Sequence, residues 1–96
     1  MRPSEALKKH RAEVRALVDG YPVANPRLFG STARGEDRED SDLDIIVQRA
    51  GDLTYFDLAE LEERLTILVG VRVDVRTEGE FSDRTLKRIS REFVPL

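Results

Sequence analysis

The chain has 96 residues, with 16 Lys and Arg against 19 Asp and Glu, so it fits one small domain and lacks the basic surplus of a general nucleic-acid coat. It contains no Cys and one His, which excludes disulfides, thiolate metal sites and zinc sites that need several imidazoles. No apolar run is long enough to span a membrane and no secretory leader is visible, so we expect a soluble protein of the cytoplasm.

The N-terminal segment predicts a helix over residues 4–19, with Ser4 as its N-cap and Gly20 as a left-handed C-terminal cap. Four of its apolar residues repeat at helical spacing and indicate one buried face: Leu7, Val14, Leu17 and Val18. Residues 21–26 contain two prolines and an asparagine, a composition that predicts a loop.

The middle of the chain predicts two strands. Residues 27–29 form a short apolar stretch that ends at Gly30, and residues 31–34 are compatible with one helical turn. The clearest strand covers residues 43–48, where three β-branched residues stand in a row. Because this apolar run is continuous rather than alternating, we expect the strand to be buried on both faces.

The C-terminal half predicts a helix, a strand and a helix. Thr54 and Asp57 resemble a capping arrangement for a helix over residues 54–69. Residues 71–76 alternate apolar and charged side chains, which is typical of a strand with one solvated face. Ser82 caps a last helix that ends near Pro95, with three inward side chains: Leu86, Ile89 and Phe93. The predicted order is α-β-β-α-β-α, an α/β (α+β) domain with a small sheet covered by helices.

Two aspartates open the predicted strand 43–48. Asp42 and Asp44 are two residues apart, so their side chains point to the same face of a strand, with Cα atoms roughly 6.5–7 Å apart. Two carboxylates on one face repel each other unless a cation lies between them. Carboxylate oxygens suit Mg²⁺, so the pair predicts a magnesium site.

Asp74 is the candidate third ligand. It lies between Val73 and Val75, which should face the core, so its side chain shares the solvated face with Arg72 and Arg76. If this strand neighbours strand 43–48, three carboxylates come together. Such a set can hold two Mg²⁺ ions roughly 3.5–4 Å apart, the apparatus of in-line phosphoryl or nucleotidyl transfer.

The turn at Gly30-Ser31 supplies a place for phosphate groups. Gly30 lets the backbone take a positive φ or approach a ligand closely. The backbone N–H groups from Ser31 onward, at the start of a helical turn, favour an anion, and the Ser31 hydroxyl can bond a terminal phosphate oxygen. Arg34 is a candidate contact of the triphosphate. A nucleoside triphosphate would then lie with its α-phosphate at the metal ions.

The combined pattern resembles the DNA polymerase β-like nucleotidyltransferases. Gly30-Ser31, ten intervening residues, Asp42-x-Asp44 and a later Asp74 on a strand follow that superfamily, and the surrounding residues are similar to its smallest branch, the minimal nucleotidyltransferases. The resemblance covers nearly the whole chain and implies a single minimal nucleotidyltransferase domain over residues 1–96.

The resemblance also implies an activity. Many members of this branch are antitoxins of toxin–antitoxin pairs that neutralise a HEPN-domain ribonuclease toxin by moving AMP from ATP to a tyrosine of the toxin, with release of pyrophosphate. Carried over by position, Asp42 and Asp44 would bridge two Mg²⁺ ions, and Asp74 would complete the site under the attacking hydroxyl. The cofactor and co-substrate would be Mg²⁺ and ATP, and no direct nucleic-acid substrate is expected.

Several alternatives compete with this interpretation. Asp42 and Asp44 could be solvated acids at the start of a strand, and Asp74 could belong to a merely wet strand face. A non-catalytic antitoxin that neutralises its toxin by binding is the main functional alternative, ahead of nucleotidyl transfer to a small molecule. A basic stripe on the last helix indicates either a solvated face or a contact for RNA or an acidic partner: Arg84, Lys87, Arg88 and Arg91.

Overall fold

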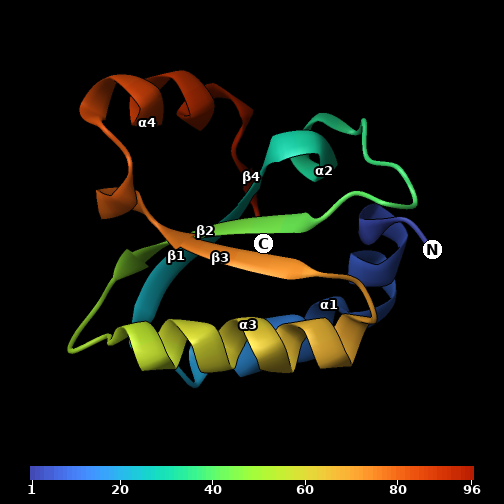
Figure 1. Cartoon of the computed structure of the whole chain (residues 1–96), viewed down its shortest axis with the longest axis horizontal. Helices are drawn as coiled ribbons and strands as arrows, with labels where there is room; N and C mark the ends of the chain where they lie inside the picture. The colour runs from blue at the N-terminus through green and yellow to red at the C-terminus, as the bar shows by residue number, and fades with distance from the viewer.

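In the computed structural model, which describes residues 1–96, helices cover both faces of a four-stranded mixed sheet (Figure 1). The sheet order is β3-β2-β1-β4, with β2 and β3 parallel and the other pairs antiparallel. α1 and α3 lie against one face, whereas α2 and α4 lie on the other. The elements are α1 Pro3–Asp19, β1 Val23–Phe29, α2 Gly30–Arg34, β2 Leu43–Arg49, α3 Tyr55–Val69, β3 Val73–Thr77, α4 Asp83–Ile89 and β4 Val94–Pro95, with short 3-10 turns at Glu78–Glu80 and Ser90–Glu92.

The main core lies between the sheet and the α1/α3 layer. Alternate residues of β2 and β3 point into it and meet the apolar stripes of the two helices; they include Leu43, Ile45, Val47, Val73, Val75, Val14, Leu61 and Leu65. Ile46 is also fully buried although it lies on the opposite face of β2. The prediction that this strand is buried on both faces is therefore confirmed. Because side chains alternate along β2, the residues between its core positions point away from the main core.

β1 is longer than the sequence pattern indicates, so the predicted loop is confirmed for residues 21–22 and wrong for residues 23–26. The pairing register of β1 with β2 shifts between Ala24 and Arg27. Asn25 takes a φ of 50°, and Pro26 has no N–H to contribute to the ladder. A β-bulge accommodates both residues, because it leaves an extra residue unpaired while the strand continues.

The C-terminus forms a strand instead of the end of a helix. α4 stops at Ile89, and Val94–Pro95 pairs with β1 as the outermost strand, so the predicted helix reaching Pro95 is wrong. Leu96 is buried, and its backbone oxygen accepts a hydrogen bond from Arg15 Nε at 2.6 Å. β4 and the short helix α2 are the additions to the predicted α-β-β-α-β-α order.

Two helix boundaries differ from expectation in their capping. The N-cap of α1 is Arg2, and the Ser4 backbone N–H instead donates to the buried Asp37 carboxylate at 2.8 Å. Gly20 has a φ of −78°, so it is not left-handed. Thr54 caps α3 as predicted.

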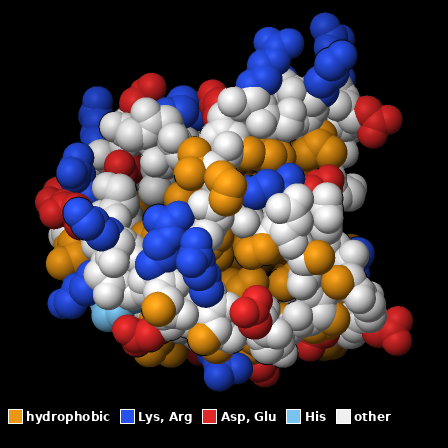
Figure 2. All heavy atoms as spheres, turned by 180° about the vertical axis from the view of Figure 1, so that it is seen from behind, with side chains coloured by type: hydrophobic (Ala, Val, Ile, Leu, Met, Phe, Trp, Pro, Cys, Tyr) orange, Lys and Arg blue, Asp and Glu red, His pale blue; other side chains and the backbone are white.

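The surface carries many charged side chains between scattered apolar ones (Figure 2). None of the helices combines the length and the apolar character that a membrane crossing requires.

Candidate active site

The register of the two parallel strands brings the predicted acids together. Asp44 of β2 lies directly beside Asp74 of β3, between the core pairs Leu43–Val73 and Ile45–Val75. Because side chains alternate along a strand, Asp44 and Asp74 point away from the main core, toward the layer of α2 and α4. Asp42 precedes Asp44 by two residues on that side.

The turn that starts α2 is built against one of these carboxylates. Phe29, the last residue of β1, pairs with Asp44, and Gly30 follows with a φ of +75°. A Cβ at residue 30 would lie 2.6 Å from Asp44 Oδ2, closer than real Cβ contacts. Glycine is thus required twice, for the backbone conformation and for the space that the carboxylate occupies. The Gly30 turn and the aspartates therefore form one site.

The carboxylates are electrostatically coupled. Burial, together with the nearby charges of Asp74 and Asp42, raises the pKa of Asp44 to about 6 against the opposing effect of Arg76 and Arg34. Burial is the largest cause of this shift, and the like charges of the neighbouring carboxylates add to it. A divalent cation would offset the repulsion between these carboxylates.

Arg72 lies at the outer edge of this cluster. Its Nε is 3.9 Å from Asp42 Oδ2 and 3.6 Å from Asp74 Oδ1, and 72% of its side chain is exposed. No group of three or more acidic or histidine side chains converges tightly enough here to enclose a metal ion as the side chains stand. The donors are carboxylates, which fit Mg²⁺, and the exposed Arg72 side chain is free to move aside. The chemistry of these donors therefore fits the ion.

The two predicted phosphate contacts, Ser31 and Arg34, lie in the short helix α2. Ser31 lies half-buried in the first turn of α2. Arg34 ends α2, but its guanidinium pairs with Glu92 at 3.1 Å and with Glu36 at 3.6 Å. Arg34 is near enough to Asp44 to influence its pKa, yet its charge is already partnered within the chain. A role in triphosphate binding would require these pairs to open.

A hollow of about 310 Å³ adjoins Asp44 and is lined by residues that sequence reasoning missed. Besides Asp44, its walls are Phe29, Arg76, Glu80 and Phe81. Arg76 carried a usable signal, since it lies two residues after Asp74 on the same strand face. Nothing in the sequence pattern pointed to Phe81, which packs edge-on against Phe29 with ring centroids 6.0 Å apart.

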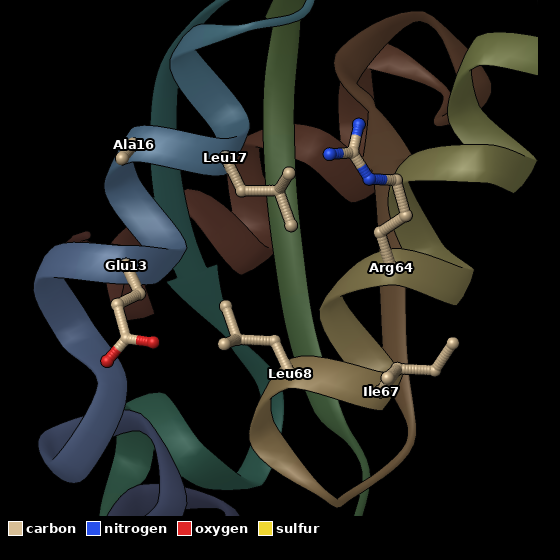
Figure 3. A pocket seen from close by; sticks show the side chains of 6 residues that line it. All are labelled: Glu13, Ala16, Leu17, Arg64, Ile67 and Leu68. Carbon is tan, nitrogen blue, oxygen red and sulfur yellow. The ribbon is translucent and has the colours of Figure 1, made fainter.

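The largest hollow of the molecule lies elsewhere. It has a volume of about 630 Å³ and is lined by residues of α1 and α3, on the sheet face away from the aspartates. Figure 3 shows Leu17 and Leu68 reaching toward each other across it, with Ile67 and Arg64 along α3. It contains none of the predicted site residues.

The raised pKa of Asp44 predicts a pH-dependent stability in metal-free protein. The carboxyl titrates at about 6 in the fold and near 3.8 when unperturbed, so its ionisation disfavours the folded state. This penalty is absent below about pH 4, grows between pH 4 and 6, and is complete above pH 6. Asp44→Asn should therefore stabilise the protein at pH 8 in EDTA, as measured by urea unfolding, and the gain should vanish near pH 4. An equal effect at both pH values would contradict the assigned titration.

Comparison with known proteins identifies the fold and the family. The sequence model of the nucleotidyltransferase domain matches residues 7–95. The chain is 36% identical over 88 residues to the protein adenylyltransferase MntA of Thermococcus cleftensis, which covers 92% of this chain and 86% of the relative. A solved structure described as a minimal nucleotidyltransferase superposes with a TM-score of 0.86 at 41% identity, covering 97% of this chain and 95% of the other.

Two more distant structures share the fold. A toxin–antitoxin structure with AMP-PNP matches with a TM-score of 0.76 at 22% identity, covering 88% of this chain and 69% of that one. A complex of a tri-AMPylated Shewanella oneidensis HEPN toxin with its MNT antitoxin matches with a TM-score of 0.69 at 21% identity, covering 92% and 69%. Taken with the aspartate pair beside the Gly30 turn, the family match over residues 7–95 shows that this chain belongs to the nucleotidyltransferase family and has the minimal nucleotidyltransferase fold.

Proposed function

We propose that this chain is the antitoxin of a toxin–antitoxin pair and acts as a protein adenylyltransferase in the cytoplasm, with residues 1–96 working as one domain. It moves AMP from ATP to a tyrosine hydroxyl of a HEPN-domain ribonuclease toxin and so neutralises the toxin. The observation that carries the proposal is the side-by-side pair Asp44 and Asp74, packed against the Gly30 turn. The name of the Thermococcus relative supports the choice of protein adenylylation within the family.

The chain's own residues divide the work of the reaction. Asp42, Asp44 and Asp74 would hold Mg²⁺, which when bound neutralises charge on the phosphate oxygens. Ser31 and the first turn of α2 would hold the terminal phosphates. Asp74, on the neighbouring strand, would orient the acceptor hydroxyl and help remove its proton. The acceptor oxygen forms a bond to the α-phosphorus while the bond from that phosphorus to pyrophosphate breaks, so pyrophosphate leaves.

Arg72 provides a test of the metal assignment that does not depend on activity. If Mg²⁺ binds among Asp42 and Asp74, the Arg72 charge opposes it, and Arg72→Gln should tighten Mg²⁺ binding. We expect a gain of only about threefold, because an exposed charge is screened by solvent. Isothermal titration of the isolated protein with Mg²⁺ measures this. Arg72→Lys, which keeps the charge, is the control; unchanged or weaker binding in Arg72→Gln would place the ion elsewhere.

Co-expression with the toxin distinguishes catalysis from the alternative, an antitoxin that works by binding alone. Growth rescue by the wild type and its loss in Asp42→Asn/Asp44→Asn, at equal protein levels, would support catalysis. Rescue by the double variant would instead favour masking of the toxin surface. Transfer of AMP to an added small alcohol or aminoglycoside, with none to the toxin, would favour the small-molecule alternative.

A further inference from the structure

Four cations stand together on α4 and the turn that follows it. They occur at i, i+3, i+4 and i+7, which places them along one side of the helix, and all are exposed: Arg84, Lys87, Arg88 and Arg91. In Figure 2, Lys and Arg side chains project from the upper edge of the molecule, where α4 lies. We call these four residues the α4 ridge.

The α4 ridge differs from the arginines around the carboxylate site, because its charges have no acidic partners. Other arginines near the site are paired within the chain, as Arg27 is with Glu78, Arg34 with Glu92 and Arg76 with Glu80. None of the ridge residues takes part in an ion pair. With the four ridge residues set aside, 12 basic residues remain against 19 acidic ones, so the ridge is a positive feature on an otherwise acidic molecule.

Two phenylalanines that flank the ridge in the sequence pack near the carboxylate site. Phe81, just before α4, lines the hollow beside Asp44. Phe93, just after the ridge, packs edge-on against Phe29 with ring centroids 6.5 Å apart, and Arg27 lies 4.7 Å over the Phe93 ring. Phe29 directly precedes Gly30, so the packing that fixes α4 is continuous with the packing that forms the site. The segment that carries the ridge is therefore anchored at both ends by aromatic residues that pack around the carboxylate site.

The geometry points to the α4 ridge as the docking surface for an acidic patch on the protein that brings the acceptor hydroxyl to the site. This inference rests on the proposed function. Charge complementarity of this kind orients a partner and speeds its encounter. A long nucleic acid fits less well, because its binding gains from many phosphate contacts across a broad basic surface, whereas acidic residues outnumber basic ones in the rest of this chain.

The test removes charge from the ridge without touching the site. In an Asp42→Asn/Asp44→Asn background, which separates binding from transfer, Arg84→Gln/Arg88→Gln should slow association with the immobilised HEPN toxin about tenfold at low salt. The difference should shrink toward zero at about 0.5 M salt, where such interactions are screened. Arg84→Lys/Arg88→Lys should restore the rate. The matched control is Lys8→Gln/Lys9→Gln, which removes two exposed charges from α1 and should change association only slightly.

Three results would overturn the inference. The first is association that does not depend on the ridge charges at any salt concentration. The second is loss of binding to a fluorescein-labelled single-stranded RNA 20-mer in the ridge variant, with toxin association unchanged. The third is a raised KM for ATP, again with toxin association unchanged. Failure of the proposed function is a separate result, because it appears as absence of AMP transfer by the wild type whatever the ridge variants do.

Discussion

Replacing the two β2 aspartates should abolish nucleotidyl transfer. We expect Asp42→Asn/Asp44→Asn to lower the rate at least about 1000-fold, because the transition state then loses the groups that would position Mg²⁺ against the transferring phosphate. The amide keeps the size of the side chain and removes its charge, so the fold should survive. Initial rates of AMP incorporation from labelled ATP into the toxin measure the effect.

The control for this change is the same substitution at an aspartate outside the site. Asp52→Asn alters an exposed acid in the loop after β2 and should leave the rate close to that of the wild type. Urea unfolding at pH 8 in EDTA should show the double variant to be at least as stable as the wild type, since the electrostatic penalty of Asp44 is relieved. A folded double variant that keeps a tenth or more of the activity would remove these carboxylates from the mechanism.

Adding one methyl group at Gly30 should damage the site almost as severely. The new Cβ of Gly30→Ala would lie 2.6 Å from Asp44 Oδ2, so the carboxylate must turn away or the turn must shift. Since catalytic groups need to be placed within a fraction of an ångström, we expect a loss of about 100-fold in the transfer rate. The positive φ adds strain of order 1–3 kcal/mol to the folded state. Transfer rates and urea unfolding on the same preparation separate the two effects.

Gly35 offers a matched control for this substitution. It ends α2 with a φ of +72°, but a Cβ there would meet no atom within 4 Å. Gly35→Ala should therefore lower the free energy of unfolding by a similar amount while keeping most of the transfer activity. If both variants lose activity equally, backbone strain rather than the crowding of Asp44 explains the result at Gly30.

The carboxylate cluster could be predicted because it depends on strand periodicity. Asp42, Asp44 and Asp74 each neighbour residues that must face the core, so their side chains are forced to the other face. The sequence did not establish that the two strands are neighbours. The structure shows that they are, because β2 and β3 pair in parallel. The Gly30 turn was likewise readable, because a glycine after a short strand signals a special backbone conformation.

Other features depend on contacts between distant residues and leave no local pattern. Val94–Pro95 is too short to read as a strand, and it becomes one only because β1 offers a free edge. The bulge at Asn25 could not be predicted, because asparagine and proline in this segment normally indicate a loop. The pairing of Arg34 with Glu92 joins residues 58 positions apart, so no spacing rule could reveal that the predicted phosphate contact is already engaged.

The measurement that tests the central claim most directly is the intact mass of the proposed HEPN-domain partner, after incubation with the purified protein, ATP and Mg²⁺. We predict mass gains of one or more AMP units on the toxin, none in a parallel reaction with Asp42→Asn/Asp44→Asn, and digestion that maps the gain to a tyrosine. An unmodified toxin in a stable complex with both versions of the protein would contradict adenylyl transfer for this pair and show neutralisation by binding.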